Sequence, residues 1–253
     1  MINVIEKTKN NALLSIVLAL VVSLLVIELS HLCSEPIANL FEAKYNLNFY
    51  TNNVFLKFFM LFFSILFIFL LNGGKLKGFG FVMPTKFRYG KFTLTVISIS
   101  IASFVFGMVV FIIFLNSLFP VESIGGSTVG FSEGESIVEM ILTVWIWSSL
   151  CEEVLTRGLL YGTIQHLASK KFLRLSLPVW ISGLFFGYMH SRLITFGMSF
   201  WFVAFIVFNT TVIGLVAGYY REKSGSLFPA FLAHFLANIV GYFPMIINQL
   251  VNS

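Results

Sequence analysis

The sequence is dominated by apolar runs that are long enough to cross a lipid bilayer. A transmembrane helix needs about 20 predominantly apolar residues, and residues 12–32 form the first of several such runs. Of the 253 residues, 58% are hydrophobic and 11% are charged, whereas soluble domains carry about 25% charged residues. This pattern predicts an all-α fold, a polytopic transmembrane helical bundle.

Apolar and polar segments alternate along the chain. The expected spans are residues 12–32, 54–71, 92–119, 135–167, 178–190, 195–220 and 228–250. Lysine and arginine are enriched in cytoplasmic loops, and the most basic loop covers residues 75–91. The N-terminal residues and residues 170–174 and 221–223 are also basic, so we expect seven spans with the N-terminus inside. Residues 178–190 are short for a span, so a re-entrant segment or one that merges with the surrounding helices stays open, and the bundle could have eight spans.

No linker or low-complexity stretch divides the chain, so residues 1–253 are expected to form a single membrane-embedded domain. Residues 33–53 are polar and carry little positive charge, and residues 121–134 are expected to form an external loop or a surface-lying segment. Cys33 and Cys151 are too few for a disulfide framework and are expected to stay unpaired. The net charge of +5 falls in the short loops, which indicates a lipid bilayer as partner and no nucleic acid.

An acidic motif interrupts the fourth apolar run. Glu152, Glu153 and Arg157 lie within six residues, and a charge at the centre of a bilayer costs at least about 2.5–3.5 kcal/mol on insertion scales. Glu153 and Arg157 are four positions apart, so they can pair across one helical turn. Glu152 is turned about 100° away and is left as a carboxylate in an apolar setting. The structural alternative is that these charges only neutralise each other and hold helices together.

Further polar residues lie in later apolar runs. His190 ends the fifth run, and the small Gly187 before it would let a neighbouring helix approach. His234 and Asn238 are four positions apart and share one helix face, which suits a water, a metal or a carbonyl oxygen, or else two interhelical hydrogen bonds. The ionisable residues of the N-terminal half lie near expected span ends, and they are Glu28, His31 and Lys57. Any chemistry is therefore expected between residues 135 and 250.

Together these side chains have the chemistry of a buried hydrolytic centre. A desolvated glutamate such as Glu152 can take a proton from water near neutral pH, and His234 and Asn238 can donate to the oxyanion of a tetrahedral intermediate. Alternatively, Zn²⁺ could be held with a water as fourth ligand by Glu152, His190 and His234. The sequence has no His-Glu-x-x-His zinc-protease signature, so both mechanisms stay open.

Three motifs resemble those of the CPBP family of intramembrane proteases. The family includes the CAAX prenyl endopeptidases and bacterial Abi or bacteriocin-processing and immunity proteins. The matching residues are Glu152-Glu153-x-x-x-Arg157-Gly158, Phe186-x-x-x-His190 and His234-x-x-x-Asn238. The resemblance covers residues 135–241, which would be the catalytic core, and the earlier spans match only in being apolar.

The resemblance implies a role for each matching residue. Glu152 would activate the attacking water together with His190, and His234 and Asn238 would stabilise the oxyanion. The family is commonly described as metalloproteases, yet a metal-free glutamate mechanism has also been argued for it. We favour the mechanism in which a glutamate and a histidine activate water, with no certain cofactor and with Zn²⁺ as the alternative.

The supporting pair, Glu153 and Arg157, would position Glu152 and His190. The resemblance implies a peptide or protein substrate in or at the membrane, such as a lipid-modified peptide. The composition is typical of a bacterial chain, so we expect a multi-pass protein of the cytoplasmic membrane that acts in peptide processing or self-immunity. A non-catalytic scaffold or immunity protein, which binds a partner through the same polar core, is the main alternative. A proton-coupled transporter is a more distant one, because no repeats are visible.

Overall fold

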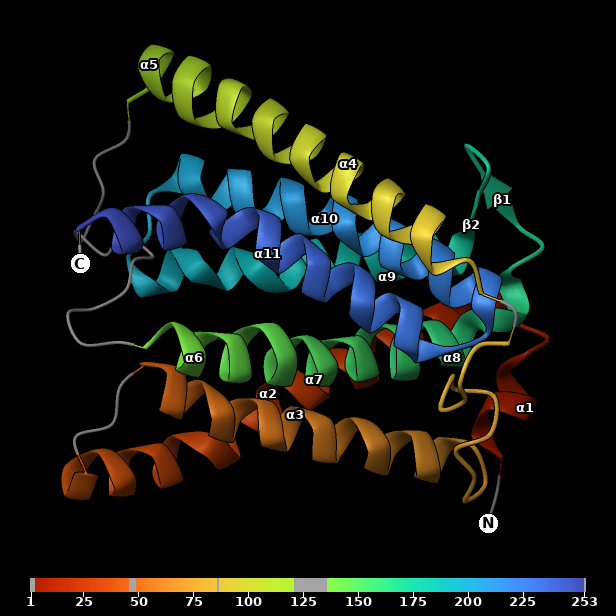
Figure 1. Cartoon of the computed structure of the whole chain (residues 1–253). Coiled ribbons are helices and arrows are strands. Elements are labelled where there is room, and N and C mark those ends of the chain that lie inside the picture. The colour runs from red at the N-terminus through yellow and green to blue at the C-terminus, as the bar shows by residue number, and fades with distance from the viewer. Residues whose placement is uncertain (1–2, 46–48, 86, 121–135, 253) are drawn as a thin grey trace.

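A computed structural model describes residues 3–45, 49–85, 87–120 and 136–252 as a bundle of helices (Figure 1). The long helices are α2 (Ala12–Tyr45), α3 (Phe49–Leu71), α4 (Tyr89–Gly107), α9 (Leu177–Met189), α10 (Phe200–Ser224) and α11 (Leu227–Asn252). The short helices are α1 (Val4–Thr8), α5 (Asn116–Leu118), α6 (Ile137–Met140), α7 (Ser149–Glu153) and α8 (Tyr161–Ile164). Wider π-helical turns cover Met108–Leu115, Ile141–Ser148 and Val154–Leu160, and 3₁₀ turns cover Gln165–Leu167 and His190–Phe196. The one small sheet in the described residues pairs β1 (Lys171–Phe172) with β2 (Leu175–Ser176).

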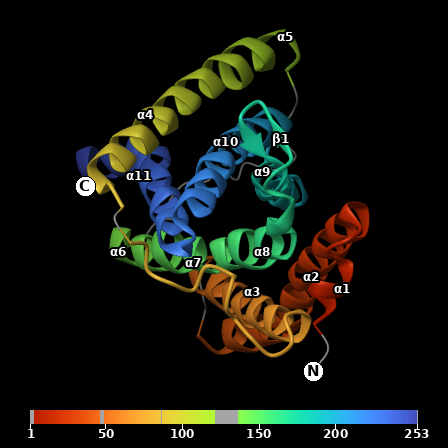
Figure 2. The ribbon, with the colours of Figure 1, turned by 90° about the vertical axis from the view of Figure 1, so that its right-hand side faces the viewer.

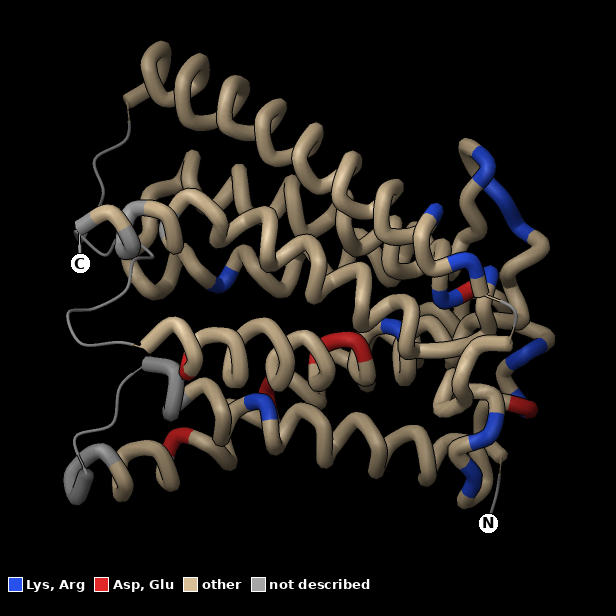
Figure 3. Tube along the Cα trace, in the orientation of Figure 1, with Lys and Arg blue, Asp and Glu red and all other residues tan. Residues whose placement is uncertain are grey.

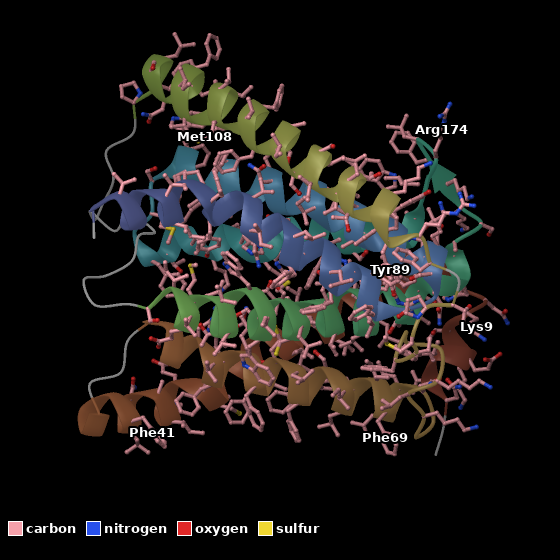
Figure 4. All side chains as sticks on the ribbon, viewed as in Figure 1. Lys9, Phe41, Phe69, Tyr89, Met108 and Arg174 are labelled. Carbon is pink, nitrogen blue, oxygen red and sulfur yellow. The ribbon has the colours of Figure 1, made fainter. Side chains whose placement is uncertain are left out.

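Within the described residues, five helices are long and apolar enough to cross a membrane, which makes the chain a multi-pass membrane protein. By length and composition they are Ala12–Phe41, Asn53–Leu71, Tyr89–Leu118, Phe200–Ser224 and Leu227–Pro244. Apolar side chains point outward along the bundle, where Phe41 and Phe69 are each more than two-fifths exposed (Figure 4). Such an outer surface suits acyl chains rather than water.

Two of the seven predicted spans are not among these five helices. The fourth runs from α6 through α8 as one rod, with α-helical and π-helical turns following each other (Figure 1). The fifth, α9, has 13 residues and is therefore only about 20 Å long, against about 30 Å of hydrocarbon. The number of crossings and the N-in orientation therefore stay predictions.

The two termini lie at opposite ends of the bundle (Figure 1). Most lysine and arginine residues gather at the end where the chain begins, and the acidic residues are scattered along the helices (Figure 3). Because basic residues favour the cytoplasmic side, this end is the one that we expect to face the cytoplasm.

The polar segment 33–53 separates the first two expected spans, and most of it is nevertheless helical. Helix α2 continues to Tyr45 with Pro36 inside it, and α3 already begins at Phe49. Alanine, leucine, glutamate and lysine are good helix formers, so polarity alone does not end a helix that has already formed. Residues 121–134, expected to form an external loop or a surface-lying segment, lie outside the described residues.

The sequence predicts a short charged turn at residues 221–226, after the span that ends at residue 220, and only the last part of this segment is a turn. Helix α10 continues to Ser224, and Arg221 is buried inside the bundle. Its guanidinium donates from Nη2 to the Gly78 carbonyl at 3.2 Å and from Nε to the Arg157 carbonyl at 3.3 Å. A Cβ at Gly80, whose φ is +89°, would lie 2.6 Å from Arg221 Nε. Arg221 is therefore an internal tie between the loop at residues 78–80 and the helices.

Helices α9 and α10 pack closely because glycines line their contact. A Cβ at Gly187 would lie 1.9 Å from Thr211 Oγ1, and one at Gly183 would lie 2.9 Å from the Leu215 backbone nitrogen. Small residues four positions apart allow this approach between membrane helices. Figure 2 shows the two helices side by side, with α11 against α10. This packing holds the end of α9, and with it His190, at a fixed place in the bundle.

Candidate active site

The acidic residues lie on α7, between two π-helical segments. Glu152 and Glu153 are both buried, and the flanking Ile141–Ser148 and Val154–Leu160 segments form wide turns. π-Helical turns are uncommon and occur often at functional sites, where they change which side chains share a face. Cys151, which precedes the two glutamates, is buried and unpaired, as Cys33 is unpaired.

The predicted pair of Glu153 and Arg157 is present. Arg157 donates from Nη1 to Glu153 Oε1 at 2.8 Å and from Nη2 to the Gly214 carbonyl at 2.7 Å. Its guanidinium carbon lies 4.7 Å from the centre of the Phe186 ring. A buried ion pair needs further contacts for its polar atoms. The Gly214 carbonyl on α10 and the Phe186 ring on α9 supply two of them, while Glu153 Oε2 and Arg157 Nε have no hydrogen-bond partner among the described residues. The pair thus joins three elements of the core.

Glu152 has a partner that the sequence analysis placed elsewhere. The ammonium group of Lys57 on α3 forms a buried ion pair with Glu152 Oε1. Lys57 lies near the start of the apolar helix Asn53–Leu71, as expected, but its pairing with Glu152 is not among the contacts that the sequence predicts. Glu152 is not a lone carboxylate, since two buried cations now balance the two buried glutamates. The signal available in the sequence was a single lysine inside an otherwise uncharged apolar helix.

His234 lies between the two carboxylates. Its Nδ1 is 3.2 Å from Glu153 Oε1, and its Nε2 is 3.8 Å from Glu152 Oε2. Since a carboxylate only accepts, Nδ1 is the donor to Glu153. The second distance exceeds that of a hydrogen bond, so Nε2 and Oε2 both remain available to a third group. The supporting role implied for Glu153 was to position Glu152 and His190, whereas its contact here is with His234.

His190 follows α9 and contacts the same ring of Phe186 as His234 does. Its Nδ1 is 2.8 Å from the Phe186 carbonyl, which fixes Nδ1 as the donor and leaves the Nε2 lone pair available. The rings of His190 and His234 both lie 5.0 Å from the Phe186 ring, edge to face. His190 is also near enough to Glu152 and His234 to interact with them electrostatically. The ring of Phe186 therefore contacts both imidazoles.

Asn238 lies one turn after His234 on α11. Its Nδ2 donates to Ser149 Oγ at 3.0 Å, and Ser149 is on the same short helix as Glu152. A carboxamide nitrogen carries two donors, so this bond leaves one of them for another group. All four residues predicted to be catalytic thus come together, from α7, the end of α9 and α11.

The residues predicted for a metal do not form a ligand set as they are arranged. Among the described residues, no group of three histidine, cysteine, aspartate or glutamate side chains is placed to hold a metal ion. Glu152 Oε1 is committed to Lys57, and His234 Nδ1 to Glu153. The atoms left for a metal are Glu152 Oε2 and His234 Nε2, which lie 3.8 Å apart, and His190 Nε2. We therefore derive no step through a metal.

Residues 134–240 match the family of type II CAAX prenyl endopeptidase Rce1-like proteins. This segment is Rce1-like. The Rce1-like segment contains all four candidate catalytic residues and the Glu153–Arg157 pair, and it covers nearly the same residues as the three motifs. This similarity supports protease activity at a membrane. Lys57 lies outside the segment. Comparisons with curated proteins and with solved structures give no match.

Proposed function

We propose that the protein is an intramembrane endopeptidase in which Glu152 and His190 activate water. The observation that carries this proposal is the buried polar cluster itself. Separate parts of the chain supply a carboxylate, two imidazoles and an amide: both imidazoles contact Phe186, Glu152 faces His234, and Asn238 is bonded to the helix that carries Glu152. Burying ionisable groups at membrane depth costs free energy, so such groups usually mark functional sites. The Rce1-like segment contains all four side chains.

The mechanism follows from the free atoms of the cluster. Glu152 Oε2 is not bonded to Lys57, so it can take a proton from a water whose oxygen attacks the peptide carbonyl carbon. His190 Nε2 offers a lone pair that orients the same water. The tetrahedral intermediate then expels the amine as the C–N bond breaks, and the proton on Glu152 passes to that nitrogen. Water, acyl group and amine are balanced without a further reactant.

The oxyanion is stabilised from α11. Asn238 offers the second N–H of its Nδ2, and His234, whose Nδ1–H is held by Glu153, donates from Nε2 when its imidazole carries both protons. Donors that are already in place where charge develops are worth about 2.7–4 kcal/mol each in model proteases. The contacts to Glu153 and Ser149 hold the two side chains in position before substrate binds.

The substrate is a peptide or protein at the membrane, with a lipid-modified chain as the favoured class. The family description names prenylated CAAX substrates, and an apolar modification would partition into the same bilayer as the bundle. A role in peptide processing or self-immunity in a bacterial cytoplasmic membrane fits the composition. A metal-assisted variant would use Glu152 Oε2 together with His190 and His234, and metal analysis of the purified protein tests it.

One observation favours a non-catalytic scaffold instead. The Lys57–Glu152 and Asn238–Ser149 contacts tie separate helices together, which is what polar residues do when they only hold a membrane bundle. In that case the function in cells would survive Glu152→Gln, provided that the variant folds.

The deciding experiment is cleavage in proteoliposomes of a quenched fluorescent peptide that ends in a prenylated CAAX sequence. Glu152→Gln and His234→Ala should each lower kcat by about 10²–10⁴-fold. Glu28→Gln serves as the control, because Glu28 is two-thirds exposed and lies outside the cluster. Full activity of both site variants would refute the proposal. A chelator added in a parallel reaction reports whether a metal is needed.

A further inference from the structure

Helix α3 places one charge inside the bundle. Lys57 is the only charged residue in the α3 sequence, and its side chain is about nine-tenths buried. An unpaired lysine at membrane depth is costly, and intramembrane charges mark functional sites by default. Helix α3 precedes the Rce1-like segment, so the family match does not account for this residue.

The Lys57 contact divides the two oxygens of the Glu152 carboxylate. Oε1 receives the ammonium group, while Oε2 faces His234 Nε2 at 3.8 Å. A carboxylate held by one oxygen cannot rotate freely, so the other oxygen keeps one direction. That direction is toward the two imidazoles, where the proposed water would be activated.

The ion pair is held in place by the docking of α3. One turn before Lys57, Asn53 Nδ2 donates to Ser148 Oγ at 2.8 Å. The Val54 carbonyl accepts from Trp147 Nε1 at 3.3 Å. Both partners belong to the segment that leads into α7. Together with the Lys57–Glu152 ion pair, three polar contacts therefore bind α3 to residues 141–153. Of these contacts, only that of Lys57 reaches the carboxylate.

We propose that Lys57 is a positioning residue that keeps Glu152 ionised and holds its Oε2 toward the histidines. The catalytic role of Glu152 rests on the proposed function, but the ion pair and its effect on the carboxylate do not. A general base must be unprotonated before it can accept a proton. An adjacent buried cation favours the carboxylate form, because removing the partner of a buried charge is strongly unfavourable. The site is then completed by a helix outside the Rce1-like segment.

The ionisation is tested with dicyclohexylcarbodiimide, an apolar reagent that enters membranes. The reagent adds to a protonated carboxyl: the acid proton goes to a reagent nitrogen and the carboxyl oxygen bonds to its central carbon. Labelling of Glu152 is measured by mass spectrometry of the purified full chain in micelles. The wild type should resist, whereas Lys57→Met should label at Glu152 at least about tenfold faster, since losing the buried partner shifts the ratio of ionised to protonated carboxyl by about 100-fold or more.

Two variants separate positioning from simple attachment of α3. Lys57→Arg keeps the cation and should resist labelling. Asn53→Leu removes the neighbouring tie to Ser148 but leaves the carboxylate untouched, so it too should resist. Equal labelling of the wild type and Lys57→Met would overturn the proposal, whether both proteins resist the reagent or both react with it. Labelling of Asn53→Leu to the level of Lys57→Met would also overturn it, because attachment alone would then explain the effect.

The same variants are then compared in peptide cleavage. With the quenched prenylated CAAX peptide as probe, Lys57→Met should lower kcat by about tenfold or more with little change in KM, and Lys57→Arg should recover most of it. A rise in KM at unchanged kcat would contradict positioning of the base. If no variant and no wild-type protein cleaves the probe while the labelling pattern holds, the proposed function fails and the positioning of Glu152 by Lys57 stands.

Discussion

Replacing Gly187 with alanine should destabilise the bundle and misplace His190. The added Cβ would lie 1.9 Å from Thr211 Oγ1 and 2.9 Å from the Val207 carbonyl oxygen. The hydroxyl of threonine could change rotamer, although a β-branched side chain has few rotamers to choose from. The carbonyl belongs to the backbone of α10 and cannot yield without moving that helix. The contact can therefore be relieved only by separating α9 from α10.

The size of the effect follows from this geometry. Overpacking a close-packed interior by one methyl group costs about 1–3 kcal/mol, and sometimes more when the backbone must move. The helix-forming preference of alanine returns about 0.8–1.0 kcal/mol of this. The backbone contact puts the overpacking cost in the upper part of this range, about 2–3 kcal/mol, so we expect a net loss of about 1–2 kcal/mol. Because His190 follows directly after α9, three residues beyond Gly187, the activity loss should exceed what the stability loss explains.

Gly241 provides the matched control for this substitution. It is also a helical glycine, but a Cβ there would meet nothing within 4 Å. Gly241→Ala should therefore be neutral or stabilising by up to about 1 kcal/mol. Unfolding of both variants in mixed micelles, followed by circular dichroism, gives the comparison. Equal stability of Gly187→Ala and Gly241→Ala would refute the close contact between α9 and α10.

Three further predictions concern the charged groups. Lys57→Met should lower the free energy of unfolding by about 3–5 kcal/mol, and adding Glu152→Gln should recover most of this loss, because both buried charges are then removed. Thermal unfolding of the single and double variants measures the coupling between the two residues, and additive losses would contradict it. Arg192→Gln should cost no more than about 1 kcal/mol in the same measurement, since the Arg192–Glu28 pair at 3.1 Å is partly exposed. Burial, together with Lys9 and Lys170, holds the pKa of His166, in the turn beyond α8, below its usual value. The folded state therefore binds fewer protons than the unfolded state, and the free energy of unfolding falls as the pH drops below about 6.5. His166→Gln should reduce that fall between about pH 7.5 and about pH 5.5.

The local features of the site could be predicted from the sequence. A spacing of four places Glu153 beside Arg157 on any helix, and the pair is present at 2.8 Å. The same spacing puts His234 and Asn238 on one face of α11, and Gly187 allows the close approach that its size suggested. These relations depend on the helical repeat alone, so they hold wherever the helices lie in the bundle.

The non-local features could not be predicted in this way. Lys57 and Glu152 are 95 positions apart, and no periodicity relates one membrane helix to its neighbour. Apolar helices of similar composition give no preferred pairing, because lipid tails are as apolar as their side chains. The place of Arg221 could not be predicted for a related reason. A charge near the end of an expected span indicates a solvated loop residue, whereas the Arg221 guanidinium donates to two backbone carbonyls inside the bundle.

The balance of charge connects these two kinds of feature. Within the Rce1-like segment, Arg157 balances one of the two buried glutamates, and the remaining carboxylate takes its cation from α3. An uncompensated buried charge costs several kcal/mol, which is a large fraction of the total stability of a domain. The segment that carries the motifs therefore depends electrostatically on a helix that carries none. A search confined to the motif residues identifies the groups that would react with substrate, but it omits the cation that keeps the proposed base in its reactive form.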